Sequence, residues 1–409
     1  MWEMASDHAT NNTGTNDMRI MYLAPRFHTN QAAVIKGWQE HGDETEFVVR
    51  KVGRLEDHSI ESPTLLPYTN QFQILYRAYL FLHHNSENAK DFDLRYGYPS
   101  TKEFSKLVKK FKPDLVILRE KSIYSMVCYR VLRKYGICTI LYNQSPLYAE
   151  KSKLQRDWKH RLVDRQLPKI RITPVLTSVF KPDGKLIKDA NCYFVPFIVE
   201  PACPPEKKTW FSGGNVRILE VGKFERRKNH LLMLNAFEKL LHEAPNTTLM
   251  IVGEVSNRFH EAYLKEIMEK IEGSKTLKGH VAVRTNVPHS EMNAIYQNCD
   301  LYVLPSTGEP AAYSILEAMA NSVAAVCSTD NGTASYIEPG INGDIFRDKD
   351  EKNLTETMLK CIQDRRKLVN MGENAYKTVC KKFVFCNYYD SLFNIPMVNN
   401  LKRNNEQPI

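Results

Sequence analysis

The chain contains no run of about 18 apolar residues, so the sequence predicts no transmembrane helix. Its first residues, MWEMASDHATNNTGTND, are polar and acidic and lack the basic and apolar regions of a signal peptide. We expect residues 1–17 to form a disordered leader. A repeat of solenoid period is also absent. These absences leave a globular protein, and its 409 residues exceed what one hydrophobic core usually serves, so we expect two domains.

Cysteine pairs of the kind that bind zinc are missing as well. The nine cysteines are scattered and odd in number, and none forms a Cys-x-x-Cys motif. Free thiols in a reducing compartment fit this pattern better than disulfides do. We therefore predict a cytoplasmic protein. If its basic residues bind a membrane, the protein would lie at the inner face of that membrane.

Positive charge is in excess, and mainly in one half. The chain carries 56 Lys and Arg against 47 Asp and Glu, a net charge of +9. Residues 1–200 hold 30 basic and 22 acidic side chains, whereas residues 201–409 hold 26 and 25. A basic first half predicts contact with an anionic surface, either nucleic acid or a membrane leaflet. The sequence contains no recognisable nucleic-acid-binding module, so we expect no nucleic acid partner.

Short apolar runs alternate with amphipathic stretches in both halves, which is the pattern of a parallel sheet covered by helices. In the first half we expect strands at 18–24, 46–49, 113–119 and 137–143, and helices at 31–41, 70–84, 101–111 and 125–135. In the second half we expect strands at 216–222, 247–253, 280–285, 300–305 and 323–328, and helices at 229–244, 261–271, 289–298 and 312–321. The predicted fold class is α/β, with two doubly wound Rossmann-like domains facing across a cleft.

Prolines and glycines cluster at residues 193–215, between two strand-like runs, and mark the domain boundary. We expect the N-terminal domain at residues 18–200 and the C-terminal domain at residues 201–385. Residues 386–409 are a C-terminal segment that we expect to cross back to the N-terminal domain. Ligands of such sheets bind at the carboxyl ends of the strands, so candidate site residues are sought there.

The second half offers an anion site where its first strand ends. The segment LEVGKFERRKNHLLML carries this strand to Gly222, continues as a basic loop and starts a helix near Asn229. Lys223 and Lys228 in this loop, beside the free amides of the helix, suit a diphosphate. The alternative is a solvated basic turn, which is common on protein surfaces.

Two glutamates follow the fourth strand of this half. Glu309 lies on a loop, and Glu317 lies about one turn into the next helix, where a carboxylate can accept two hydrogen bonds from a ribose. The helix is expected to begin near Ala312, with free amides that face the cleft. These donor-binding amides belong to Ala312, Tyr313, Ser314 and Ile315. In the alternative both glutamates are surface charges, although the apolar neighbours of Glu317 are unusual for a solvated carboxylate.

Three motifs together carry a resemblance. The spacing of Glu309 and Glu317, the upstream VGKFERRKNH and the downstream NGTASYIEPGINGDIF resemble the nucleotide-sugar domain of retaining family 4 glycosyltransferases, which have the glycosyltransferase-B fold. The resemblance covers nearly all of residues 18–395. It implies that the C-terminal domain binds the nucleotide sugar and the N-terminal domain the acceptor.

The family also implies roles for individual residues. A cation directly after the strand glycine, here Lys223 after Gly222, and a lysine five positions later, here Lys228, bind the donor diphosphate. The first glutamate of the pair, matching Glu309, approaches the donor sugar, and the second, matching Glu317, approaches the ribose. We therefore expect Glu309, Lys223 and Lys228 to be catalytic.

The first half departs from the family. The usual glycine pair after the first strand is replaced by APRFHTNQAA, and the usual histidine near the reacting sugar is replaced by the neighbourhood of Asn143. His28 in the first loop is a further candidate catalytic residue, in contact with the acceptor, although a lone loop histidine is more often structural or solvated. Arg26, Asn30 and Asn143 are further acceptor or cleft candidates.

A metal site is not expected. Metal-dependent transferases of the other major fold hold a cation with two aspartates one residue apart. The pairs at residues 91–93 and 348–350 do not follow strands that lead into the cleft, so both are interpreted as surface charge. The lysines and the helix amides would neutralise the diphosphate instead.

One further stretch, KSKLQRDWKHRLVDRQLPKIR at residues 151–171, combines basic residues with an apolar stripe at helical spacing. This profile fits an interfacial helix on an anionic membrane. The alternative is a solvated helix whose stripe packs on its own domain.

The sequence thus favours a retaining, metal-independent glycosyltransferase with no cofactor. It would move a sugar from a UDP- or GDP-linked donor to a hydroxyl of a glycan or lipid-linked acceptor, in bacterial polysaccharide or lipopolysaccharide biosynthesis. Two alternatives remain open. One is another glycosyltransferase-B enzyme, such as a sugar-nucleotide epimerase or a synthase with a soluble acceptor. The other is a non-catalytic nucleotide-sugar-binding protein.

Overall fold

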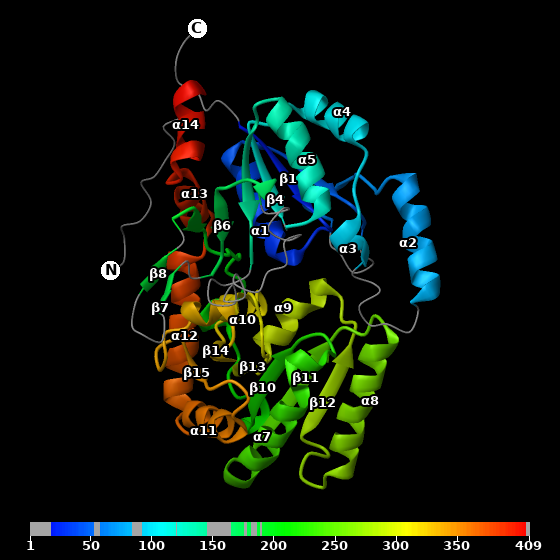
Figure 1. The fold of residues 1–409 in the computed structure, drawn as a ribbon. Coiled ribbons are helices and arrows are strands. Elements are labelled where there is room, and N and C mark those ends of the chain that lie inside the picture. The colour runs from blue at the N-terminus through cyan, green and yellow to red at the C-terminus, as the bar shows by residue number, and fades with distance from the viewer. Residues whose placement is uncertain are drawn as a thin grey trace, which may run out of the picture.

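The computed structural model describes residues 18–52, 58–83, 92–119, 121–144, 165–175, 178–180, 186–188 and 190–405, apart from a few side chains in these ranges. The described chain forms two halves, one above the other in Figure 1, and each is built on a parallel sheet with helices on both faces. The expected leader at residues 1–17 and the basic stretch up to residue 164 lie outside the described residues.

The N-terminal sheet has the strand order β3-β2-β1-β4-β5-β6-β9, and all its strand pairs are parallel. Its strands are β1 (Arg19–Ala24), β2 (Glu44–Val49), β3 (Thr64–Leu65), β4 (Leu115–Arg119), β5 (Cys138–Tyr142), β6 (Arg171–Thr173) and β9 (Cys192–Phe194). A separate antiparallel pair is formed by β7 (Ser178–Phe180) and β8 (Leu186–Lys188). The helices of this half are α1 (Thr29–His41), α2 (Asn70–Leu82), α3 (Phe92–Tyr96), α4 (Thr101–Phe111) and α5 (Ile123–Lys134).

The C-terminal sheet has the order β12-β11-β10-β13-β14-β15 and is also wholly parallel. Its strands are β10 (Val216–Val221), β11 (Thr247–Gly253), β12 (Val281–Thr285), β13 (Leu301–Leu304), β14 (Ala324–Ser328) and β15 (Gly343–Phe346). Its helices are α7 (His230–Glu243), α8 (Arg258–Gly273), α9 (His289–Gln297), α10 (Ser314–Ala320), α11 (Glu351–Ile362) and α12 (Arg365–Lys382). In both sheets the strand order reverses beside the first strand, so a crevice opens at the carboxyl ends.

The central strands are apolar on both faces because helices cover both sides. All five residues of β4 and of β14 are buried. One core of the C-terminal half joins the sheet to α7, α8 and α11, and a second joins it to α9, α10 and α12. Helix ends follow local capping chemistry: Ser100 caps α4 by accepting from the Glu103 amide at 3.3 Å, and Asn257 caps α8.

The chain returns to the N-terminal half at its end. Helices α13 (Phe385–Phe393) and α14 (Pro396–Asn405) lie beside the N-terminal sheet in Figure 1. The buried Trp38 of α1 contacts the Phe385 ring at 5.1 Å between centroids, and its indole nitrogen donates to the Tyr22 hydroxyl at 2.8 Å. The N-terminal core therefore includes side chains from residues almost 350 positions away.

The predicted α/β fold class with two doubly wound domains is confirmed. Two local expectations are wrong. The helix expected near Ala312 begins at Ser314. Asp93, interpreted as surface charge, is 4% exposed, accepts from the Tyr68 hydroxyl at 3.3 Å and has the Lys51 ammonium 3.9 Å away.

Candidate active site

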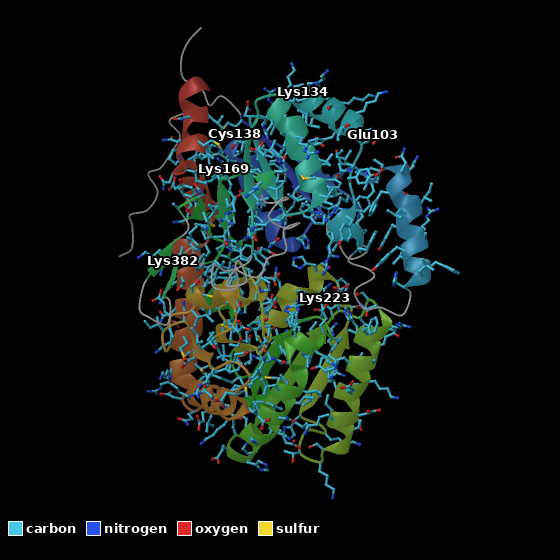
Figure 2. All side chains as sticks on the ribbon, viewed as in Figure 1. Glu103, Lys134, Cys138, Lys169, Lys223 and Lys382 are labelled. Carbon is cyan, nitrogen blue, oxygen red and sulfur yellow. The ribbon has the colours of Figure 1, made fainter. Side chains whose placement is uncertain are left out.

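The basic loop between β10 and α7 lies where the two halves meet, and Figure 2 labels Lys223 there. Gly222 still belongs to the sheet, since its amide donates to the Val252 carbonyl at 2.9 Å. A Cβ at Gly222 would come within 3.1 Å of the Lys228 side chain. Glycine at this position therefore lets the aliphatic part of Lys228 lie against the end of the strand.

Asn229 ties this loop to the loop that carries Glu309. It adopts a left-handed conformation (φ 57°) directly before α7, which asparagine tolerates better than most residues. Its side-chain amide donates to the Pro305 carbonyl at 2.9 Å and to the Thr307 hydroxyl at 2.7 Å. The loops after β10 and β13 therefore form one connected edge of the crevice.

Glu309 is fixed by its own backbone. Its amide donates to the Asp330 carbonyl at 3.0 Å, and its carbonyl accepts from the Gly332 amide at 2.9 Å. A Cβ at Gly332 would lie 1.8 Å from the Pro310 carbonyl oxygen, so only glycine permits this approach. The carboxylate is thus held on a loop braced from both sides, with 7% of the residue exposed.

The Glu309 carboxylate meets two cations. One oxygen accepts from the Arg227 guanidinium at 2.8 Å and also from the Lys228 ammonium. Burial opposes ionisation of Glu309, but Lys228 and Arg227 outweigh it and hold the pKa of this carboxyl below its usual value. Burial lowers the pKa of Lys228, the Glu309 carboxylate offsets this only in part, and the positive charge of Arg227 lowers the pKa further. The structure thus brings Lys228 and Glu309 into direct contact.

Lys223 lies closer to solvent. Its ammonium is 3.2 Å from the Glu254 carboxylate at the end of β11. Its carbonyl oxygen lies 3.0 Å from Nε2 of the buried His230, whose Nδ1 is 2.7 Å from the Glu220 carboxylate. Burial lowers the pKa of His230, yet the Glu220 carboxylate outweighs it, so this pKa is raised above its ordinary value. A buried ion pair therefore lies directly beneath the backbone of Lys223.

Glu317 has a different environment from Glu309. It accepts from the Tyr296 hydroxyl at 3.1 Å, and His289 lies 4.0 Å from its other oxygen. Burial raises the pKa of Glu317, and His289 and Tyr296 counter this only in part. The two glutamates thus have pKa values shifted in opposite directions, Glu309 downward and Glu317 upward.

The amides expected at the start of α10 differ from one another. The Ala312 amide donates to the Thr333 hydroxyl at 3.2 Å and is therefore occupied, contrary to expectation. Tyr313 precedes the helix, and its hydroxyl donates to the Ile198 carbonyl at 3.0 Å. Ser314 is the first helical residue and accepts from the Tyr302 hydroxyl at 2.7 Å, while Ile315 is fully buried. The backbone amides of these last three residues remain the candidates for a ligand.

His28 of the N-terminal half is an uncharged imidazole close to several cations. His28 ends the loop after β1 and occupies the N-cap position of α1, where its side chain makes no capping hydrogen bond. Burial lowers the pKa of His28 well below its usual value, and the charges of Arg119, Arg26 and Lys223 lower it further. At neutral pH the imidazole is therefore uncharged.

Two of the acceptor candidates take part in local structure. Asn30 is 8% exposed and accepts from the Arg119 guanidinium at 3.2 Å. Asn143 continues the strand pattern after β5, since its amide donates to the Ile172 carbonyl at 2.9 Å. Asn30 therefore lies within contact of Arg119, and Asn143 lies at the carboxyl end of the next strand.

The aspartates considered for a metal have structural partners. Asp348 accepts from the Thr307 hydroxyl at 2.7 Å, and Asp350 caps α11 by accepting from the Asn353 amide at 2.9 Å. Among the residues that the structure describes, His, Cys, Asp and Glu do not gather in a group that could hold a metal ion. All nine cysteines are free thiols.

Sequence reasoning missed Arg119, Arg227 and Glu254 as site residues. Arg119 is 7% exposed at the end of β4 and stacks on the Tyr142 ring at 5.3 Å. A charge that ends an otherwise apolar strand, as in PDLVILR, is a signal that could have identified it. Glu254 directly follows Gly253 at the corresponding end of β11. Arg227 was visible only as one of several basic residues in its loop.

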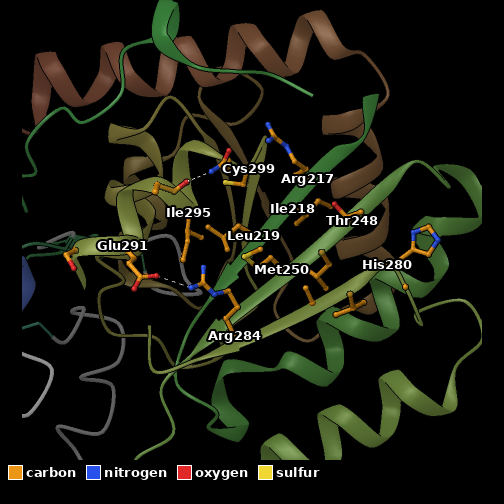
Figure 3. A pocket seen from close by; sticks show the side chains of 17 residues that line it. Arg217, Ile218, Leu219, Thr248, Met250, His280, Arg284, Glu291, Ile295 and Cys299 are labelled. Carbon is orange, nitrogen blue, oxygen red and sulfur yellow. Dashed lines mark hydrogen bonds and ion pairs between the residues drawn. The ribbon is translucent and has the colours of Figure 1, made fainter. Parts of the chain in front are cut away.

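A cavity of about 560 Å³ lies elsewhere in the C-terminal half, between α9 and the strands β10, β11 and β12 (Figure 3). Leu219, Met250 and Ile295 line it, and the Arg284–Glu291 ion pair (3.0 Å) lies at its edge. The described residues that line this cavity include neither Glu309 nor the lysines of the basic loop, so it is separate from the candidate site.

The two facing parallel sheets, with a basic loop and a buried carboxylate at their carboxyl ends, define the glycosyltransferase-B fold. Residues 206–378 match the family model of glycosyl transferases group 1. The family resemblance predicted from the sequence is confirmed at this level.

Individual proteins are similar over parts of the chain. Mannosylfructose-phosphate synthase of Agrobacterium fabrum is 27% identical over 224 residues, 51% of this chain and 49% of the relative. The lipopolysaccharide core biosynthesis mannosyltransferase LpcC of Rhizobium leguminosarum is 28% identical over 162 residues, 40% of this chain and 45% of the relative. The chain thus spans about half the length of these curated relatives.

A solved structure matches over most of the chain. HepE from Anabaena, in complex with UDP-glucose, has a TM-score of 0.65 and 14% sequence identity, and the match covers 95% of this chain and 99% of that protein. This similarity establishes the fold.

Proposed function

We propose that the protein is a retaining, metal-independent glycosyltransferase that moves a sugar from a UDP- or GDP-linked donor to an acceptor hydroxyl. The contact of Glu309 with Lys228 and Arg227, at the edge where Lys223 also lies, is the observation that supports this most strongly. It joins a carboxylate able to reach the donor sugar with cations able to hold the adjoining diphosphate.

Each group has a task in the proposed reaction. Lys223 and Lys228 hold the diphosphate and neutralise the charge that builds on it as the glycosidic bond breaks. The free amides before and at the start of α10 add hydrogen bonds to the donor. Glu317 holds the ribose, and Glu309 lies beside the sugar ring, where positive charge develops. The acceptor hydroxyl attacks from the face that the diphosphate leaves, which keeps the anomeric configuration.

The N-terminal domain, residues 18–200, binds the acceptor in this proposal, and residues 201–385 bind the donor. His28, Arg26, Asn30 and Asn143 are the proposed acceptor contacts, and the missed residue Arg119 joins them. An uncharged His28 can accept or donate a hydrogen bond to an acceptor hydroxyl. The C-terminal segment 386–409 belongs to the N-terminal domain in this division.

The acceptor is proposed to be a glycan or lipid-linked molecule of bacterial polysaccharide or lipopolysaccharide biosynthesis, consistent with the name of LpcC. The enzyme would then work in the cytoplasm at the inner face of the membrane, and residues 151–171 would contact anionic lipid. Within the described residues, every helix is too short or too polar to cross a bilayer. A soluble phosphorylated acceptor is a second candidate, supported by the similarity to mannosylfructose-phosphate synthase.

Donor binding tests the proposal first. In thermal-shift measurements, one of UDP, GDP and their sugars should stabilise the protein, by about 2.7 kcal/mol at a hundred times its dissociation constant. Lys228→Met should abolish this shift, whereas Lys239→Met should not, since Lys239 is an exposed lysine of α7. With labelled donor, transfer should continue in EDTA and yield the donor's own anomer. An inverted product, or activity that EDTA removes and magnesium restores, would disprove this mechanism.

A further inference from the structure

The two carboxylate oxygens of Glu309 have different surroundings. Oε2 accepts from the Arg227 guanidinium at 2.8 Å and also from the Lys228 ammonium. Oε1 receives no hydrogen bond from any group within the described residues. The Glu309 side chain is only 8% exposed, so the two cations fix its orientation. Oε1 is therefore the oxygen that can still accept a hydrogen bond from a ligand.

Lys228 cannot remain the partner of Glu309 throughout the proposed reaction. The same ammonium is expected to hold the donor diphosphate, whose charge competes with the carboxylate for it. A buried carboxylate that loses its only cation is strongly destabilised. Arg227 is the second cation on Oε2, so it can keep Glu309 ionised and in place while Lys228 turns to the diphosphate.

Arg227 is itself held from several sides. Its backbone carbonyl accepts from the Thr307 amide at 2.8 Å, which ties it to the loop of Glu309. Its Nε donates to the Glu225 carboxylate at 3.0 Å, while its Nη1 donates to Glu309. A planar guanidinium between two fixed carboxylates has a single orientation that satisfies both. The Arg227 side chain therefore has a defined position although it is 42% exposed.

A buried histidine supports Glu225. The Glu225 carboxylate lies 3.4 Å from Nε2 of His260, which is 2% exposed in the first turn of α8. The Ser256 amide donates to Nδ1 of His260 at 3.3 Å, so the proton of the neutral ring lies on Nε2, the nitrogen near Glu225. A row of polar contacts thus connects α8 to Arg227.

We propose that Arg227 is a positioning residue for Glu309 during sugar transfer, and that Glu225 in turn positions Arg227. With Lys228 on the diphosphate, Arg227 holds Oε2 and keeps Oε1 toward the sugar ring, where positive charge develops. Arg227 acts through Glu309 in this role and does not need to touch the donor. The inference rests on the proposed function, since it takes Glu309 to lie beside the donor sugar.

Initial rates with the UDP and GDP sugars, together with isothermal titration of UDP and GDP, test the inference. Arg227→Met should lower kcat by up to about a hundredfold, because Glu309 is misplaced, while the affinity for the nucleoside diphosphate changes much less. Arg227→Lys should restore part of kcat, since a lysine can hold Glu309 but does not hold both carboxylates. Removal of the guanidinium also raises the pKa of Glu309, so as pH decreases the rate of Arg227→Met should begin to fall at a higher pH than the rate of the parent.

A second substitution tests the role of Glu225. Glu225→Ala should also lower kcat, and the double variant Glu225→Ala with Arg227→Met should be no slower than Arg227→Met alone, because Glu225 acts through Arg227. Arg226→Met is the matched control in the same loop. Its side chain is 72% exposed and pairs with Glu266, so this variant should keep the kcat and the affinity of the parent.

Circular dichroism and thermal unfolding show whether each variant is folded, and Arg227→Gln carries the same comparison if Arg227→Met does not fold. A folded Arg227→Met with the kcat of the parent would overturn the inference and leave the proposed function intact. So would equal losses of kcat and nucleotide affinity, or losses that add fully in the double variant. A parent that binds neither UDP nor GDP and transfers no sugar would refute the proposed function, and the inference with it.

Discussion

Glu309 and Lys228 neutralise each other in the structure, and a bound diphosphate would have to compete for that lysine. Glu309→Gln removes the competing charge, so the nucleotide diphosphate should bind at least as tightly as to the parent. Turnover should nevertheless fall about a hundredfold, because a group beside the sugar ring acts mainly as the bond breaks. Isothermal titration and initial rates provide the two quantities. Weaker binding with unchanged turnover would remove Glu309 from the reaction and leave it as a structural partner of Lys228.

Glu317 should give donor binding a pH dependence. Burial raises the pKa of Glu317 above 4.5, so the folded protein favours the protonated form. Protonated Glu317 therefore contributes to the stability of the fold below pH 4.5, and this contribution is lost as pH rises through the folded pKa. A ribose needs the carboxylate as acceptor, so donor affinity should change in the opposite sense and fall as pH drops through that raised pKa. Titrations carried upward from pH 4.5 should show this step in the parent and not in Glu317→Gln. Parallel curves for the two proteins would contradict the role given to Glu317.

The basic loop between β10 and α7 depends on a buried pair of side chains, Glu220 and His230. Glu220 and His230 are 1% and 0% exposed, and Nε2 of His230 lies 3.0 Å from the carbonyl oxygen of Lys223. His230→Ala should cost about 3–5 kcal/mol of unfolding free energy, because it leaves a buried carboxylate without its partner. The loss should be largest below pH 6.5 and shrink as pH rises through the raised pKa of His230, where the parent's ion pair is itself lost.

Urea unfolding across this pH range measures the effect. His242→Gln, an exposed position on the same helix, should change the unfolding free energy by less than about 0.5 kcal/mol. Glu220→Gln combined with His230→Gln should cost less than His230→Ala, since no buried charge is left alone. An equal cost for the double variant would mean that packing, and not charge, holds this element.

Elements with strong periodicity were predictable, and the short ones were not. Helix α4 runs from Thr101 to Phe111 as expected, because Ser100 caps it and its apolar residues keep helical spacing. Strand β11 also has its expected bounds. Strands β6 and β9 have three residues each, too few for a period to be recognised.

The same limit applies to the candidate site. Motif spacing was enough to propose Lys228 and Glu309, which the fold brings into contact over 81 residues. Arg119 and Glu254 come from strands of different sheets, and nothing in their local sequence relates them to the glutamates. Asp93 was misjudged because its burial depends on tertiary contacts, such as the one with the Tyr68 hydroxyl, 25 positions earlier in the chain. Sequence periodicity predicts which face of an element is apolar, but it does not predict which other element covers that face.

The chain returns to its first domain at its end, where α13 packs on α1. Substitution of Gly37 tests how closely these two helices pack. A Cβ at Gly37 would lie 2.1 Å from the Phe385 ring, because α1 and α13 pack directly against each other. Replacing a glycine inside a helix by alanine ordinarily stabilises by about 0.5–1 kcal/mol. Gly37→Ala should instead destabilise by about 1–3 kcal/mol through overpacking. Gly273→Ala, at the end of α8 where a Cβ would meet nothing within 4 Å, should not destabilise.

In a double-mutant cycle, Phe385→Ala should cancel most of the cost of Gly37→Ala, since it removes the ring that the new methyl group meets. Thermal and urea unfolding of the parent, the two single variants and the double variant of this cycle give these differences. A Gly37→Ala variant as stable as its parent would mean that α13 does not pack on α1 in solution.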